Sequence, residues 1–505
     1  MVFRNFLVYR KRGNEDMRAK KKIVMLLSAI LLTNVIPSSI YADEAQQQEL
    51  QKVMQEINQK NEQLNASSDS TDIFRYNFKN KKSKLTKKDN AIMWKEYKKK
   101  KVKKSLSASL AKKEVAWLFR LFRSQYGLYA YYGGDAKFEE AQKAIIKEIK
   151  KQDTIKVKKY QKLLHDHLNF INDAHLAIGE ELFLQDIRLF SDESVHYIKK
   201  GENFYKEEDL EEDAIIRING RQPDVYLKHA IDEDGSLTYY PYAMLKQEDN
   251  SCNYNIEYQS GKTESILLKP AKYSYKETVD RMYGYDQYES LAYVEMNLAY
   301  MKEELPEERK RFLKDVSNMK KQDCLIFDLR NNPGGDGTLI DEWFQDYTGQ
   351  ALQPNYNTLR IRPIWINSAK EMKKEDKYFI KSGLKKDGKY YYLNYPNHQY
   401  LKNEGKKVFV LTSRRTSSSA EAMTDALRNI ENTVVIGTNT GGVLINMANY
   451  QMAMPYSGLF LQFGECLQNF EPSYFKESYG MEPDIYLTGE NLSERLKKFF
   501  EKYVI

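Results

Sequence analysis

Apolar residues recur at helical spacing in two N-terminal stretches of the chain. One face of a short helix is marked by Leu50, Val53, Met54 and Ile57. A stronger pattern lies between residues 105 and 185, where apolar positions fall three or four apart. We therefore expect a charged helical extension and a basic linker over 43–104, and a helical unit over 105–185 whose last amphipathic helix ends at His175.

Short strand patterns follow the helical unit. Residues 186–275 predict a small, mostly β module, with turns at Asn219-Gly220, Asp234-Gly235 and Ser260-Gly261. Over 276–505 short apolar runs alternate with helical patterns, and the clearest strands are 324–329, 408–412 and 434–436. This alternation is typical of an α/β core.

The N-terminus predicts export. Residues 18–42 combine a basic start, an apolar run over 23–36 and the small residue Ala42 at the cleavage position. The apolar run is too short for a membrane span of about 20 residues. We expect residues 1–42 to be removed as a signal peptide, with Met17 as an alternative start, and the mature protein to be secreted or associated with the cell surface.

Charge argues against a nucleic-acid partner. The whole chain carries +8, but +6 of it lies in the first 42 residues, so the mature chain carries only +2. The remaining basicity is local, in a lysine-rich stretch that begins at Lys79 and ends at Lys104. Such a run is either a solvated arm or a contact for an anionic cell surface.

Neither disulfides nor metals have a sequence signature here. Three cysteines cannot all pair within one chain, and Cys324 lies in an apolar, strand-like run. His165 and His167 are two residues apart on a predicted helix, so they point in nearly opposite directions and cannot share an ion. We expect no metal and no cofactor.

The most informative segment runs from residue 407 to 437. A buried strand leads into the sequence TSSSAEAMTDALR, whose apolar positions predict a helix, and a second strand follows. Ser418 would stand at the strand-to-helix junction, where unpaired backbone N–H groups stabilise negative charge. The alternative is an ordinary serine N-cap.

A second segment, DLRNNPGG over 328–335, is a buried strand followed by a glycine turn, which lets backbone approach a ligand closely. Together with TSSSAE it resembles the catalytic core of the tail-specific, or carboxyl-terminal processing, serine proteases and of tricorn-like peptidases. LAYVEMNL, VVIGTNTGG and GMEPDI resemble further landmarks of this family in the same order, so that the resemblance covers about residues 280–490. It implies a crotonase- or Clp-like spiral β-α core, a peptide substrate, and Ser418 as nucleophile, with Glu421 ending the motif and Ser417 and Ser419 as neighbouring candidates.

The family resemblance also bears on the general base. Relatives of the bacterial type use a lysine about 25 residues after the serine, but here that place reads Thr440, Gly441, Gly442, Val443. The tricorn-like branch uses a histidine from the N-terminal helical region, and this chain has NDAHLAI there. The resemblance thus implies His175 as base, since a serine hydroxyl needs one near neutral pH. Ala174 stands where the branch has glycine.

The resemblance further implies an acid that orients His175 and an oxyanion hole. Glu477 precedes GMEPDI and is the implied acid, while Asp173 is the competing candidate. The oxyanion hole would use the N–H groups of Ser419 and of Gly334 or Gly335.

Three functions stay open at this point. The first is a secreted serine endopeptidase acting on peptides or unfolded segments. The second is an inactive relative that binds peptides or surface polymers, which the missing lysine favours. The third, a thioester enzyme on the same core, is disfavoured by export. IIRINGRQPD also resembles a phrase of PDZ modules, which capture extended peptides by strand addition.

Overall fold

The fold is described from a computed structural model of the chain. The signal-peptide prediction and most of the lysine-rich stretch fall outside the described residues. The structure describes 44–64, 68–77, 85, 101–208, 213–246, 248–249, 251–273, 282–299, 306–361, 373, 377, 380, 384–395, 398–447 and 449–504.

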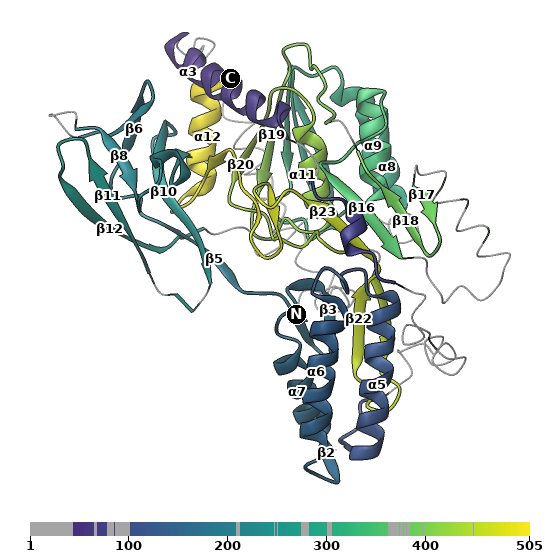
Figure 1. Cartoon of the computed structure of the whole chain (residues 1–505). Coiled ribbons are helices and arrows are strands. Elements are labelled where there is room, and N and C mark those ends of the chain that lie inside the picture. The colour runs from purple at the N-terminus through teal and green to yellow at the C-terminus, as the bar shows by residue number, and fades with distance from the viewer. Residues whose placement is uncertain are drawn as a thin grey trace, which may run out of the picture.

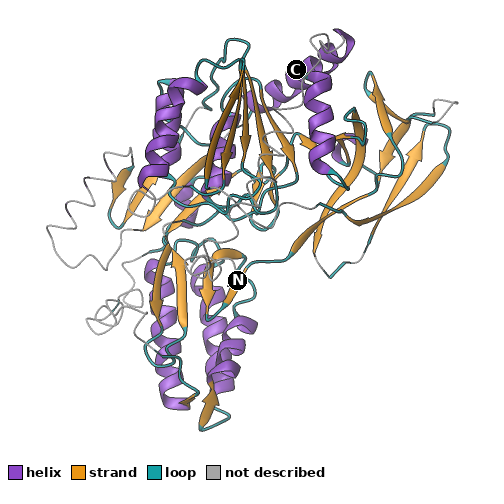
Figure 2. Ribbon diagram, turned by 180° about the vertical axis from the view of Figure 1, so that it is seen from behind, coloured by secondary structure: helices purple, strands orange, loops and turns teal. Residues whose placement is uncertain are grey.

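The α/β core is confirmed. Its parallel strands, in spatial order, are β14 (Leu291–Met296), β15 (Cys324–Asp328), β19 (Lys407–Thr412), β20 (Thr433–Gly437) and β26 (Ile485–Tyr486), and β13 (Tyr283–Tyr288) joins antiparallel at the edge. Helices lie on both sides of these strands (Figure 2). Three of these strands, β15, β19 and β20, are buried on both faces, which is why their sequences are nearly continuous apolar runs.

Alternate residues of each core strand face different helices. Leu325 and Phe327 belong to the cluster that contains α8 (Pro306–Met319), α9 (Thr338–Thr348) and α11 (Ser419–Arg428). Cys324 and Ile326 belong to the opposite cluster, formed with α3 (Glu44–Glu62) and α12 (Leu492–Tyr503). Cys324 is thus a free core residue, as expected.

The predicted N-terminal extension is part of this core. The apolar face of α3 is almost fully buried, and Asn58 on the same helix bonds Asn432 and Tyr400. The helix therefore closes one face of the α/β core.

A helical lobe projects from the core (Figure 1). It contains α5 (Ala108–Gln125), α6 (Gly134–Ile149) and α7 (Val157–His167), together with an antiparallel sheet of β21 (Asn449–Ala453), β22 (Phe460–Gly464), β3 (Asp173–Ile178) and β4 (Glu181–Phe183). The expectation that His175 ends a helix is wrong: α7 ends at His167, and His175 lies in β3. All six residues of β3 are buried, so the strand shows neither alternation nor helical spacing.

The β module is confirmed as strands and turns. It comprises β5 (Ile187–Ser191), β6 (Tyr197–Lys200), β7 (Asn203–Lys206), β8 (Ile215–Ile218), the 3-10 helix η5 (Pro223–Val225), β9 (Leu227–Ile231), β10 (Leu237–Lys246), β11 (Cys252–Tyr258) and β12 (Thr263–Pro270). Each of the three predicted dipeptides lies in a connection next to a strand. Its sheet continues that of the core, because β9 pairs with β26. The PDZ-like interpretation stays a prediction.

The remaining elements are short or lie at the periphery: η2 (Thr71–Phe74), β1 (Ser105–Ser107), β2 (Thr154–Lys156), β16 (Tyr356–Ile361), β17 (Lys385–Asp387), β18 (Tyr390–Leu393), β23 (Cys466–Phe470), β24 (Phe475–Lys476) and β25 (Gly480–Met481). None of the helices in the described residues is long and apolar enough to cross a membrane.

A buried ion pair stabilises the packing of α11, the helix that follows Ser418. Arg428, in the last turn of α11, lies 3.2 Å from the Asp484 carboxylate, and both side chains are 1% exposed. Arg428→Met leaves that carboxylate buried beside a neutral side chain, so we expect the free energy of unfolding to fall by about 3–5 kcal/mol in denaturant titrations.

Lys60→Met is the matched control for this prediction. Lys60 lies 3.6 Å from the same carboxylate but is 52% exposed, so its removal is expected to cost less than about 1 kcal/mol. Equal losses in the two variants would contradict the assignment of stability to the buried pair.

Candidate active site

Ser418 occupies a strained position between β19 and α11. It is the N-cap of α11 with φ 55° and ψ −122°, a backbone conformation that residues other than glycine rarely adopt. The side chain is only half-buried, so a ligand can reach it. A strained serine at a strand-to-helix junction is how several hydrolases expose a nucleophile.

Glu421 holds the backbone of Ser418 in this conformation. The Glu421 side chain is fully buried and accepts four hydrogen bonds: from Ser418 N at 2.9 Å, Val443 N at 2.8 Å, Gly442 N at 2.8 Å and Thr440 Oγ1 at 2.6 Å. Burial raises the pKa of Glu421 above its ordinary value, and the four donors oppose this. Since every partner donates, the group acts as a carboxylate.

The structure brings His175 to Ser418 although 243 residues separate them. His175 Nε2 lies 3.5 Å from Ser418 Oγ, the outer limit of a hydrogen bond. Contacts between catalytic groups in ligand-free sites are often this loose. Burial lowers the pKa of His175 below its usual value, and the Asp173 charge partly opposes this, so the ring is neutral and basic near pH 7.

The predicted orienting acids do not contact the His175 ring. Glu477 accepts from the backbone N–H groups of Ala174, Leu444 and Ile445 at 3.0–3.1 Å, and burial together with the Asp173 charge raises its pKa well above the usual range. Within the described chain, His175 Nδ1 has no hydrogen-bond partner. The expected Glu477–His175 contact is therefore not formed in this structure.

Asp173 acts on His175 through the backbone and through space. One of its carboxylate oxygens accepts from His175 N at 2.8 Å, and the other accepts from Tyr126 Oη and Asn446 Nδ2, both at 2.8 Å. Asp173 is fully buried. Its charge therefore lies close to the imidazole without touching either ring nitrogen.

The predicted oxyanion donors divide into two kinds. Gly334 N donates to Asn332 Oδ1 at 2.9 Å, so this N–H is already used. No hydrogen bond among the described residues uses the N–H of Gly335 or that of Ser419. The Ser419 hydroxyl donates to Gly335 O at 2.9 Å and ties the two segments together. Of the two glycines, Gly335 keeps a donor available.

Val443 stands where lysine-dependent relatives would have their base. Its N–H donates to Glu421, and its aliphatic side chain cannot accept a proton. The segment at 440–443 therefore bonds Glu421 and contains no basic side chain.

Sequence patterns missed the residues that join the site's segments. Arg414, four residues before Ser418, donates to the carbonyl oxygens of Thr440, Ser478 and Tyr479. Tyr126 and Asn446 fix Asp173 from two other elements. No motif marks these three residues, because each bonds partners far away in the sequence.

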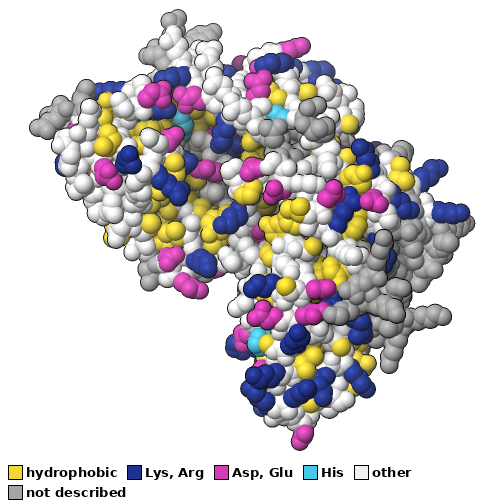
Figure 3. Space-filling view, viewed as in Figure 1, with side chains coloured by type: hydrophobic (Ala, Val, Ile, Leu, Met, Phe, Trp, Pro, Cys, Tyr) yellow, Lys and Arg dark blue, Asp and Glu magenta, His cyan; other side chains and the backbone are white. Residues whose placement is uncertain are grey.

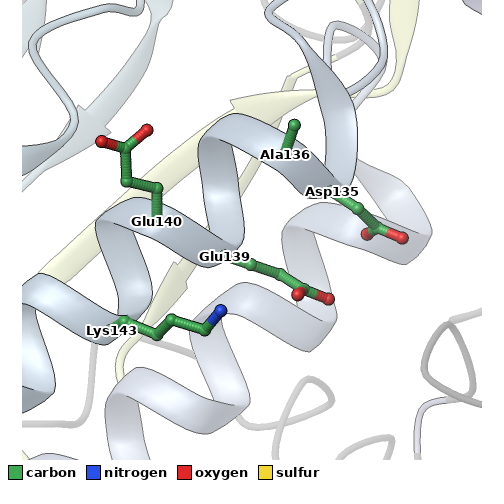
Figure 4. A pocket seen from close by; sticks show the side chains of 5 residues that line it. All are labelled: Asp135, Ala136, Glu139, Glu140 and Lys143. Atoms are coloured by element: carbon green, nitrogen blue, oxygen red, sulfur yellow. The ribbon is translucent and has the colours of Figure 1, made fainter.

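Two observations concern the described residues away from Ser418 and His175. No group of three or more His, Cys, Asp or Glu side chains there could hold a metal ion. A surface depression on α6 is lined by Asp135, Ala136, Glu139, Glu140 and Lys143 (Figure 4). It includes neither Ser418 nor His175.

The contact between Gly334 and Ser418 yields a test of this geometry. A Cβ on Gly334 would lie 2.7 Å from Ser418 Cβ, and its φ of +101° already disfavours a side chain. We expect Gly334→Ala to displace Ser418 and to slow its labelling by a fluorophosphonate about 100-fold or more.

Gly349→Ala serves as the control. Gly349 also has a positive φ, +76°, but a Cβ there meets nothing within 4 Å. This variant is expected to lose about 1 kcal/mol of stability and to keep its labelling rate. A Gly334→Ala protein that reacts as fast as Gly349→Ala would refute the close contact.

Comparison with known proteins adds a family to this geometry. Residues 290–487 match the family model "Peptidase family S41", a range that contains Ser418, Glu421 and Glu477 but not His175. No curated protein sequence matches the chain.

Similar solved structures share little sequence identity with this chain. Mature CPAF has 14% identity and a TM-score of 0.40, with 78% of this chain and 95% of CPAF covered. The photosystem II D1 C-terminal processing protease has 11% identity and a TM-score of 0.34, with 76% and 93% covered. A lipoprotein from Streptococcus agalactiae has 12% identity and a TM-score of 0.35, with 75% and 92% covered. Residues 290–487 are therefore similar to peptidase family S41, and this similarity supports a serine-type peptidase.

Proposed function

We propose that this protein is a secreted serine endopeptidase that cleaves peptides or unfolded protein segments through an acyl-enzyme on Ser418, with His175 as general base. The observation that carries the proposal is the 3.5 Å approach of His175 Nε2 to Ser418 Oγ at a strained, half-buried helix N-cap. The S41 domain supports the reaction class, and the pattern of residues 18–42 supports export.

The first half-reaction transfers the acyl group to the enzyme. As Ser418 Oγ attacks the scissile carbonyl carbon, its proton passes to His175 Nε2. The N–H groups of Gly335 and Ser419 are the donors available for the oxyanion, and each is worth about 3–4 kcal/mol in hydrolases of this kind. The imidazolium then gives its proton to the leaving amine as the peptide bond breaks.

The second half-reaction repeats this with water. His175, neutral again, accepts a proton from the attacking water, and the acyl–oxygen bond to Ser418 breaks with return of that proton to Oγ. Asp173 supports both halves, because its buried charge favours the imidazolium. Glu477 supports them indirectly, since it bonds Ala174 N next to His175 and the loop at 444–445.

A second candidate is an inactive relative that binds peptides or surface polymers. It is favoured by the missing lysine at Val443 and by the unpartnered His175 Nδ1 within the described chain. The two candidates differ in whether the serine is activated, and a covalent probe reports on this directly.

We expect a fluorophosphonate to label the mature protein on Ser418, with labelling lost in Ser418→Ala and reduced at least about 1000-fold in His175→Ala, because the base is gone. Intact-mass spectrometry and peptide mapping measure both results. Ser417→Ala and His165→Ala are the controls and should label like the wild type. A wild type that remains unlabelled would favour the binding-protein candidate.

The Asp173 charge should set the pH dependence of labelling. His175 acts in its neutral form, so labelling falls as pH drops through its pKa, which burial holds below the ordinary 6.5. Asp173→Asn removes a charge that raises this pKa. We therefore expect the acid limb to move to lower pH and the plateau rate to fall about tenfold, as the imidazolium loses stabilisation.

Asp315→Asn is the control for the pH profile. Asp315 also accepts a hydrogen bond from a tyrosine, Tyr283, but lies on α8. Its profile should match that of the wild type. An acid limb that moves to higher pH in Asp173→Asn would contradict the role given to Asp173.

A further inference from the structure

Exposed lysines gather at the far end of the helical lobe. The basic tip, as we name it, consists of Lys103, Lys104, Lys147, Lys150, Lys151, Lys156, Lys158 and Lys159, all exposed. These lysines lie in two segments of the chain, 103–104 and 147–159. The segments also contain two acidic residues, Glu148 and Asp153, so that together they carry a net charge of +6. Figure 3 shows Lys and Arg side chains at this lower end of the molecule.

Backbone pairing brings the two basic segments together. β1 pairs with β2, with Ser105 opposite Lys156, and Val157 N donates to Lys104 O at 3.0 Å. Lys103 N donates to Ser457 O, which adds the turn between β21 and β22. The charges are therefore fixed on one ordered end of the lobe.

The basic tip lies far from the candidate active site. The helix α5 starts at the tip and ends at Gln125, next to Tyr126, whose hydroxyl bonds Asp173. Eighteen residues of helix place the two ends about 27 Å apart. The tip thus has no part in binding a substrate at Ser418.

We propose that the basic tip docks this protein on a membrane surface rich in anionic phospholipids. The tip is the protruding end of the helical lobe (Figure 1), and its exposed lysines complement a negatively charged surface. Each lysine near such a surface increases the binding constant about fivefold. Val102, 58% exposed between Lys101 and Lys103, adds a small apolar contact. Docked in this way, the enzyme keeps Ser418 on the side away from the lipid.

The test is cosedimentation of the mature full-length chain with phosphatidylcholine vesicles in which about one third of the lipid is phosphatidylglycerol. We expect binding at low salt, loss of binding at about 0.5 M salt, and none to pure phosphatidylcholine. The variant Lys150→Glu, Lys156→Glu, Lys158→Glu, Lys159→Glu should bind more than about tenfold more weakly.

A charge-matched variant separates the tip from net charge. Lys262→Glu, Lys314→Glu, Lys320→Glu, Lys321→Glu changes four exposed lysines in the β module and around α8. It should keep vesicle binding within about twofold, and both variants should keep the thermal midpoint and the fluorophosphonate labelling rate of the wild type.

Two results would overturn the proposal: equal loss of vesicle binding in both variants, or a wild type that binds soluble polyphosphate but not anionic vesicles. Neither result depends on Ser418 chemistry, because vesicle binding is measured without turnover. An unlabelled wild type that still binds vesicles through the tip would refute the proposed peptidase alone.

Discussion

The carboxylate of Glu421 is the point on which the candidate site depends. Ser418 can hold its strained backbone only if something outweighs a cost of order 1–3 kcal/mol. Glu421 does so from within the same helix, by accepting the Ser418 N–H while its other hydrogen bonds fix the loop at 440–443. The buried Glu421 side chain therefore holds both the backbone of Ser418 and the loop at 440–443 in place.

A second constraint follows from where the base comes from. Ser418 belongs to the α/β core, whereas His175 lies on β3 in the helical lobe. The distance between them is set by contacts across that boundary, chiefly Asp173 with Asn446 and Glu477 with Ala174. The two buried acidic side chains thereby join β3 to the loop that follows β20. The proposed proton transfer between Ser418 and His175 therefore requires the lobe and the core to remain packed.

The sequence was sufficient to locate the core and the helix of its best-marked segment. Strands buried on both faces leave continuous apolar runs, so β15, β19 and β20 could be located, and helical spacing located α11. The sequence was misleading at His175. A fully buried six-residue strand after an amphipathic helix has no periodicity of its own, and its residues read as more helix.

What the sequence could not provide is pairing between distant segments. Glu477 was expected on the His175 ring because of its place before GMEPDI, but its carboxylate is used by three backbone N–H groups. Gly334 and Gly335 are adjacent, and the sequence motif does not distinguish them. Only Gly335 keeps its backbone N–H available, because the N–H of Gly334 donates to Asn332 Oδ1. Such differences arise from hydrogen-bond competition in the folded chain.

The absence of a lysine at Val443 is compatible with the proposed reaction, because His175 of the helical lobe lies within reach of Ser418. Val443 N donates to Glu421, and in the proposed reaction the proton passes instead to His175, which lies in another part of the fold. A base on the loop at 440–443 would not depend on the position of the helical lobe. A base on β3 makes the reaction conditional on that lobe, and the lobe's far end carries the basic tip. The proposed chemistry at Ser418 and the proposed attachment at the basic tip therefore depend on the same helical lobe.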